Sequence, residues 1–140
     1  MNTTNDPAIL YPLFALATLT ATVQVLIPIA RVRAALRGEV AVDDFRYRES
    51  ATVPAAVSVP NRNYMNLLEF PQLLYVICVL AYVATTVTPL MVQLAWVFIG
   101  LRALHSLIHL TYNHVAQRGL VFGVSNIAML ALWIQVGLHL

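Results

Sequence analysis

Residues 9–30 read ILYPLFALATLTATVQVLIPIA, an uncharged run that ends directly before Arg31. A helix needs about 20 mainly apolar residues to cross a bilayer, so this run predicts a membrane span over about 9–33. The segment before it, Met1–Asp6, lacks the positive charge with which a cleaved signal peptide begins. We therefore expect the first span to be retained in the protein.

The composition of the whole chain agrees with a membrane protein. Of the 140 residues, 60% are hydrophobic and 10% are charged, and the mean hydropathy is +0.76. A soluble domain has about 25% charged residues. A polar loop is expected at about 37–61, and further apolar runs predict spans at about 63–87, 89–113 and 119–138. The sequence therefore predicts an all-α fold, a single membrane domain over residues 1–140 that forms a four-helix bundle.

The distribution of positive charge predicts how the chain crosses the membrane. All eight basic residues are arginines, and six of them lie in or beside the loop 37–61. Arg118 lies in the only other loop on that side, and the opposite side has none. By the positive-inside rule, both arginine-bearing loops are cytoplasmic and both termini are extracytoplasmic. Nucleic acid is not an expected partner, because its recognition needs a clustered basic face on a soluble module.

The second span carries polar residues on one helical face. Arg62, Asn66 and Glu69 are spaced i, i+4 and i+7, which aligns them at 3.6 residues per turn, and Gln72 extends the stripe by one turn. An ionised side chain within a span costs about 2.5–3.5 kcal/mol, so such residues usually mark a function or face a protein interior. A guanidinium, an amide and a carboxylate together suit a zwitterionic ligand.

The third span carries a second polar face, formed by Arg102, His105, His109 and Asn113. We expect the two faces to meet. Arg102 lies near the middle of its span, where a carboxylate such as Glu69 of a neighbouring helix would neutralise it. Interhelical hydrogen bonds that only hold the bundle together are an alternative for each of these residues.

Metal or haem ligation is a further alternative for the pair His105 and His109, which are spaced i, i+4. No acidic residue lies beside them and no cysteine lies on their helix, so we predict no metal site. Cys78 is the only cysteine of the chain. Neither a disulfide nor a cysteine-ligated metal site is therefore expected within one chain.

Two stretches carry a resemblance to a known family. Residues 62–71 read RNYMNLLEFP, an arginine, an asparagine four residues on, a glutamate three further and a nearby proline, and residues 100–102 read GLR before a polar face. Together with four spans and a long first loop, this pattern resembles the membrane-associated proteins in eicosanoid and glutathione metabolism (MAPEG). The resemblance covers essentially the whole chain. Within the family, the sequence is similar to the microsomal glutathione transferases.

The resemblance implies a homotrimer that binds glutathione near the cytoplasmic face, between neighbouring subunits. It implies that Arg62, Asn66 and Glu69 hold the carboxylate and amino groups of glutathione, together with Arg31 and with Arg33 as a further candidate. His105 and His109 stand at positions where relatives carry tyrosines. Phe70 likewise stands where several relatives carry a tyrosine. Arg118 corresponds to an arginine that stabilises the thiolate, if a gap of about two residues is allowed.

The function that follows is a membrane glutathione transferase or glutathione-dependent peroxidase. Glutathione would be the co-substrate and a lipophilic electrophile or lipid peroxide the substrate, with Arg118, His109 and His105 as candidate catalytic residues. Two alternatives stay open. One is a non-catalytic scaffold or accessory subunit with the same fold, and the other is a haem or metal protein that uses the two histidines.

Overall fold

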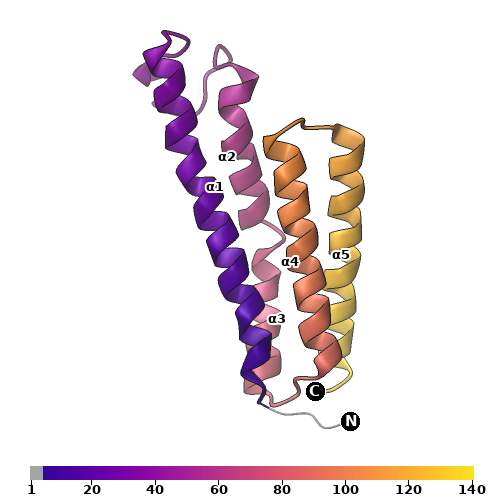
Figure 1. Cartoon of the computed structure of the whole chain (residues 1–140). Coiled ribbons are helices and arrows are strands. Elements are labelled where there is room, and N and C mark those ends of the chain that lie inside the picture. Colours follow the sequence, from indigo (N-terminus) through magenta and orange to yellow (C-terminus); the bar gives the residue numbers. More distant parts are fainter. Residues whose placement is uncertain (1–4) are drawn as a thin grey trace.

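The computed structural model describes residues 5–140, and within them it contains helices and no strand. Four segments are long and apolar enough to cross a membrane, namely Pro7–Leu36, Ala55–Val83, Pro89–Leu110 and Val115–Gly137. The predicted all-α fold with four membrane helices is therefore confirmed. Figure 1 shows these segments side by side as one bundle.

The first span is a short 3-10 turn, η1 (Pro7–Leu10), that leads directly into α1 (Tyr11–Leu36). Asp6 caps its start, because its carboxylate accepts a hydrogen bond of 2.9 Å from the backbone N–H of Ala8. α1 continues through Pro28 and extends three residues beyond the expected end at 33. Gly38, with φ of +71°, then turns the chain away, a conformation that glycine adopts without a Cβ clash.

The second span differs from its prediction in both its start and its continuity. α2 (Ala55–Leu68) begins well before residue 63, so the expected loop at 37–61 ends at Pro54. Pro54 precedes the helix as its N-cap, and Pro60 lies inside it as the sixth residue, where it removes only the hydrogen bond that an N–H would give to the carbonyl of Ala56. Arg62 consequently lies two turns inside the helix rather than at its start.

A break then divides this span into α2 and α3 (Gln72–Val83) at residues 69–71. Pro71 has no N–H to give to the carbonyl of Leu67, so the regular ladder of helical hydrogen bonds is interrupted there. Tight turns connect α2 to α3 across this break. In one of them the N–H of Gln72 donates a hydrogen bond to the carbonyl of Glu69 at 3.2 Å. Gln72 therefore begins a new helix and does not simply extend the polar stripe of α2.

The third and fourth spans, α4 (Pro89–Leu110) and α5 (Val115–Gly137), make the most extensive contact between elements. Only residues 111–114 join them, so the two helices form an antiparallel hairpin. α1 and α2 form a second pair (Figure 1). α4 begins after the short link 84–88 and runs opposite to α3.

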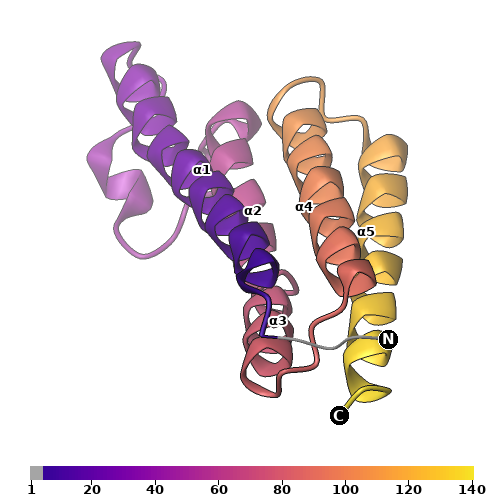
Figure 2. The same cartoon turned by 60° about the horizontal axis from the view of Figure 1, so that its bottom comes forward.

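The hydrophobic core lies where η1, α1, α3, α4 and α5 meet. Fully buried side chains from these elements pack there, among them Ile9, Leu16, Leu74, Phe98 and Leu132. Large apolar side chains such as Phe14 are exposed on the outside, as expected for a surface that faces lipid. α1 begins and α5 ends at the same end of the bundle (Figures 1 and 2).

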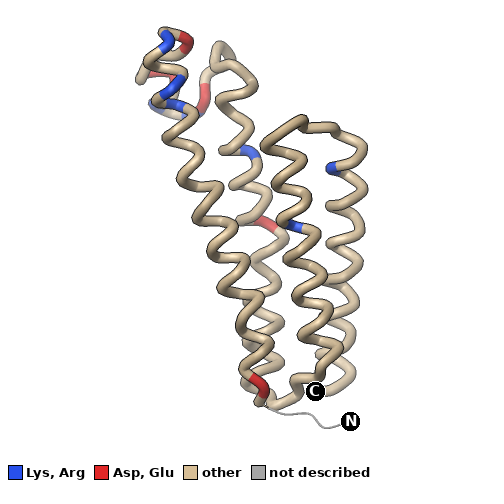
Figure 3. Tube along the Cα trace, in the orientation of Figure 1, with Lys and Arg blue, Asp and Glu red and all other residues tan. Residues whose placement is uncertain are grey.

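Charged residues gather at the opposite end, around the connection between α1 and α2 (Figure 3). That connection contains a short 3-10 helix, η2 (Val42–Phe45). Asp44 organises it, because its side chain accepts hydrogen bonds from the Ala41 backbone N–H at 2.7 Å and from the Ser50 hydroxyl at 2.8 Å. These bonds hold the pKa of the Asp44 carboxyl below its usual value.

Candidate functional site

The polar face predicted on the second span is present on α2 and is open. Arg62 and Glu69 are exposed, and Asn66 is half-buried. The buried positions Asn63 and Leu67 face the rest of the bundle, so the helix turns the other three residues away from it. Within residues 5–140, neither Arg62 nor Glu69 forms an ion pair. The face is available to a ligand or a neighbouring subunit.

The polar face of α4 is buried, in contrast to that of α2. Arg102, His105 and His109 are 1%, 3% and 3% exposed. They pack toward α5, where the ring of Phe122 lies 5.7 Å from the ring of His105. Within residues 5–140 these side chains contact α5, and no hydrogen bond or ion pair joins them to Arg62, Asn66 or Glu69.

Arg102 has aromatic rings rather than a carboxylate around it. Its guanidinium carbon lies 4.7 Å from the ring centre of Phe122 and 5.4 Å from that of Phe98. The expected pair with Glu69 is not formed within the described part of the chain. A guanidinium over an aromatic face is attracted by the negative charge of the ring face, which partly replaces a counter-ion.

His105 joins the third span to the start of the fourth. Its Nδ1 lies 3.2 Å from the backbone carbonyl oxygen of Arg118. A carbonyl oxygen can only accept, so Nδ1 carries the hydrogen, and in a neutral imidazole Nε2 is then the acceptor. That Nε2 is buried and has no hydrogen-bond partner within residues 5–140. His109 lies beside it, with ring centres 5.8 Å apart in an edge-to-face arrangement.

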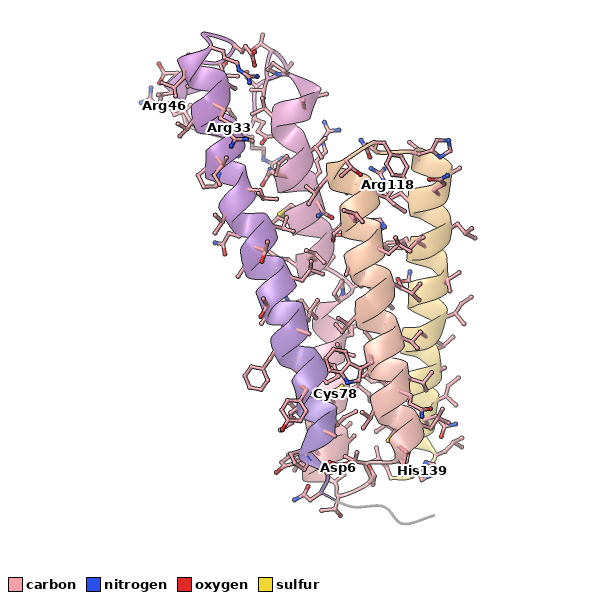
Figure 4. The ribbon with its side chains drawn as sticks, viewed as in Figure 1. Asp6, Arg33, Arg46, Cys78, Arg118 and His139 are labelled. Atoms are coloured by element: carbon pink, nitrogen blue, oxygen red, sulfur yellow. The ribbon has the colours of Figure 1, made fainter. Side chains whose placement is uncertain are left out.

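Arg118 is held at the corner between α4 and α5 (Figure 4). The fourth residue of α5, it is half-buried, and its Nη1 donates a hydrogen bond to the side-chain oxygen of Asn113. Among residues 5–140 no carboxylate pairs with it. His105 contacts its backbone carbonyl, so the imidazole of one predicted catalytic residue lies beside the main chain of another that is thirteen residues further along the sequence.

Arg31 lies elsewhere, near the end of α1, beside the loop that connects α1 to α2. It pairs with Glu49 at 3.1 Å and stacks over Phe45 at 4.5 Å. An open pocket of about 610 Å³ adjoins it, lined by Arg31, Phe45, Arg48, Glu49, Asn61 and Met65. Arg62 does not line this pocket, so one chain does not bring Arg31 together with the polar face of α2. Arg33 is exposed near the same end of α1 (Figure 4).

Sequence reasoning missed several residues that shape the site. The hydroxyl of Ser106 donates to the side-chain oxygen of Asn63 at 3.3 Å, which ties α4 to α2. Ser106 follows His105 in the sequence, and Asn63 follows Arg62. Both are polar residues within a predicted span or at its start, and this signal could have identified them. No comparable signal marks Phe122, which resembles any other apolar residue of its span until the fold places it between Arg102 and His105.

Within residues 5–140, no three His, Cys, Asp or Glu side chains come close enough together to hold a metal ion. Cys78 is buried in α3 as a free thiol.

Comparison with known proteins identifies the family of the chain. The MAPEG family model matches residues 9–138, which is nearly the whole chain. A search of curated proteins and a search of solved structures each give no match. The family match covers all four spans, the open polar face of α2 and the corner that holds Arg118. On this match, the resemblance seen in residues 62–71 is confirmed, and the chain belongs to the MAPEG family.

Proposed function

We propose that this protein is a membrane glutathione transferase or glutathione-dependent peroxidase that acts on lipophilic electrophiles. The observation that carries the proposal is the open polar face of α2 and its C-cap, where Arg62 and Glu69 are exposed and form no ion pair with any of residues 5–140. Charged side chains within membrane spans usually pair with one another or mark a functional site. Membership of MAPEG makes glutathione the ligand to test first.

Glutathione matches this face in chemistry. Its two carboxylates suit the guanidinium of Arg62, its ammonium group suits the carboxylate of Glu69, and its amides suit Asn66. Arg31 lies on the other side of α2 within one chain. We therefore propose a homotrimer in which Arg31 of a neighbouring copy completes the site, as the resemblance implies.

The chemistry would take place at the corner between α4 and α5. The thiol proton of glutathione would pass to Nε2 of His105, the acceptor that Nδ1 leaves free, and the guanidinium of Arg118 would stabilise the thiolate. His109 lies beside this pair and would orient the sulfur. The thiolate sulfur would then form a C–S bond to the electrophile while the leaving group departs with its electron pair and takes up a proton.

A hydroperoxide would be reduced at the same position. The thiolate would attack the terminal peroxide oxygen, the O–O bond would break, and the released alkoxide would take a proton to give the alcohol. A second glutathione would attack the resulting sulfenic acid, forming glutathione disulfide and water. The lipophilic substrate would reach the site from the bilayer. The active site would face the cytoplasm, with both termini outside.

Calorimetry of the detergent-purified protein with glutathione tests the proposal. We expect saturable binding in the millimolar range or tighter, reduced at least tenfold by Arg62→Ala or Glu69→Gln because each removes a charge-assisted contact. Arg37→Ala is the matched control, an exposed arginine outside the site. No heat of binding for the unaltered protein at millimolar glutathione would contradict the proposal.

Turnover separates a binding protein from an enzyme. Purified protein should conjugate glutathione to a chloro-dinitrobenzene acceptor or reduce an organic hydroperoxide, and Arg118→Ala should lower kcat more than it raises KM. If glutathione binds but neither reaction occurs, the enzymatic part of the proposal is wrong and the scaffold alternative gains support.

A further inference from the structure

We propose that Asn113 is a positioning residue, whose side-chain amide holds the guanidinium of Arg118 in place before a glutathione thiolate arrives. The part of this inference that concerns the thiolate rests on the proposed function. The contact between Asn113 and Arg118 is independent of it. It assigns a role to a residue of the α4–α5 corner that the sequence pattern placed only among the polar residues of the third span.

The backbone of the corner is fixed independently of any ligand. Asn113 has φ of +48°, in the left-handed region, where asparagine is one of the few residues found regularly. Its N–H donates to the carbonyl of Ile108 at 2.8 Å, and the N–H of Thr111 donates to that of Leu107 at 3.1 Å. These bonds close the end of α4 and fix the origin of the Asn113 side chain.

From that point the Asn113 side chain reaches forward to Arg118. Its Oδ1 accepts the hydrogen bond from Nη1 across the first turn of α5. The backbone of Arg118 is held as well, by its N–H to the carbonyl of His114 at 3.0 Å and by Nδ1 of His105 on its own carbonyl. Arg118 is therefore fixed both at its main chain and at the tip of its side chain.

The neutral charge of Asn113 matters for catalysis. A carboxylate at this position would hold the guanidinium equally well but would neutralise it, whereas an amide oxygen leaves the full positive charge for a thiolate. The other ionisable groups around the corner are Arg102, His105 and His109 on α4, Arg62 on α2, and Tyr112 and His114 in the connection itself. None of these groups carries a negative charge at neutral pH, so the corner keeps a net attraction for an anion.

The tether also reduces what ordering the arginine would otherwise cost. A free arginine side chain samples many rotamers, and that conformational entropy is lost when the side chain becomes fixed against a ligand. Fixing the side chain beforehand moves that loss from the reaction to the folding of the protein. Removing the tether should therefore lower the rate of the chemical step while glutathione is still held by the residues of α2.

A purely structural role for Asn113 is the competing explanation, because left-handed backbone alone selects for asparagine or glycine. Asn113→Gly separates the two explanations, since glycine keeps the backbone conformation and removes only the tether. Asn113→Asp keeps an oxygen acceptor and adds a negative charge. Thr111→Ala is the matched control, a residue of the same corner whose hydroxyl bonds to the carbonyl of Leu107 and not to Arg118.

The first readout needs no glutathione. Phenylglyoxal modifies accessible, mobile guanidinium groups, and peptide mass spectrometry reports its rate at Arg118. We expect Arg118 to react several-fold faster in Asn113→Gly than in the unaltered protein, and at the unaltered rate in Asn113→Asp and Thr111→Ala. Equal rates in Asn113→Gly and the unaltered protein would overturn the inference.

The second readout follows the thiolate of bound glutathione by its ultraviolet absorbance against pH, together with kcat and KM. For Asn113→Gly we expect kcat to fall about ten- to a hundredfold with KM within twofold. For Asn113→Asp the midpoint of thiolate formation should rise by about one pH unit, because the added carboxylate opposes the charge of Arg118.

Failure of the proposed function would be distinguishable from failure of this inference. If the unaltered protein binds no glutathione, the role in thiolate formation is wrong together with the proposed function, and the modification rates alone decide whether Asn113 holds Arg118. If glutathione binds and Asn113→Gly keeps the unaltered thiolate titration and kcat, the residue serves only the backbone and the inference is wrong.

Discussion

Arg31 and Glu49 form an ion pair of 3.1 Å between α1 and the loop that follows it, eighteen residues further along the chain. Both side chains are partly shielded from solvent, with exposed fractions of 33% and 17%. Phe45 covers the guanidinium from another side, at 4.5 Å. The loop between the first two spans therefore supplies Arg31 with a carboxylate before any ligand reaches it.

Glu49→Gln should strengthen glutathione binding. If Arg31 contributes to the site of a neighbouring subunit, Glu49 competes with the carboxylate of the ligand, and a partly exposed pair of this kind contributes up to about 1 kcal/mol. We expect the Kd for glutathione, measured by calorimetry, to fall about two- to fivefold. Glu39→Gln removes an exposed partner of Arg37 and serves as the control. An unchanged or higher Kd for Glu49→Gln would place Arg31 outside the glutathione site.

Phe122→Leu should destabilise the protein by about 2 kcal/mol, because it removes the ring whose centre lies 4.7 Å from the Arg102 guanidinium carbon. Arg102 is buried, and contacts between a cation and an aromatic ring are strongest away from water. Unfolding by SDS titration measures the loss. The matched control is Phe14→Leu, whose ring is 69% exposed. Its free energy of unfolding should stay within about 0.5 kcal/mol of the unaltered value. Equal effects of the two substitutions would contradict a role for Phe122 in accommodating Arg102.

Asp44 should make the loop between α1 and α2 sensitive to acid. Its pKa in the folded loop lies below the model-compound value of 3.8. A lowered pKa means that the carboxylate stabilises the loop fully above that value, and that this stabilisation is lost as the pH falls through the lower, folded pKa. We expect digestion of the loop by pepsin to accelerate in that range.

Asp44→Asn should reproduce the acid effect at neutral pH, where trypsin cleavage after Arg46 and Arg48 reports how well the loop is ordered. Asp43→Asn, at the neighbouring exposed position, is the control. Cleavage of Asp44→Asn at the rate of this control would show that the hydrogen bonds of Asp44 do not organise the loop.

The orientation with both termini outside can be tested by cysteine labelling, because the only native cysteine, Cys78, is fully buried. In intact cells a membrane-impermeant maleimide should label Leu140→Cys at the C-terminus and should not label Ala51→Cys in the loop. Permeabilised cells should show labelling at both positions. The reverse pattern in intact cells would mean that the arginine-bearing loops face outward.

Length, hydropathy and the positions of arginines were enough to predict four membrane helices and to place Arg62, Asn66 and Glu69 on one helical face. These features depend on helix periodicity and on the free-energy cost of placing a charge in the hydrocarbon core of the bilayer. Both are properties of residues that are close together in the sequence. The motif in residues 62–71 was likewise enough to indicate the family. Pro71 was visible in the sequence, but its break of the span depends on how the free carbonyls are accommodated by the surrounding helices.

Only the tertiary structure decided which residues meet. The polar residues of α4 came to contact α5, Arg102 received two phenylalanine rings in place of Glu69, and Arg118 came to lie against His105 and Asn113. Helical periodicity gives the direction of a side chain around its own axis, but the partner on that side depends on how the helices pack. The sequence by itself thus determined the spans and the chemistry available, and the packing of α4 on α5 determined where that chemistry is assembled.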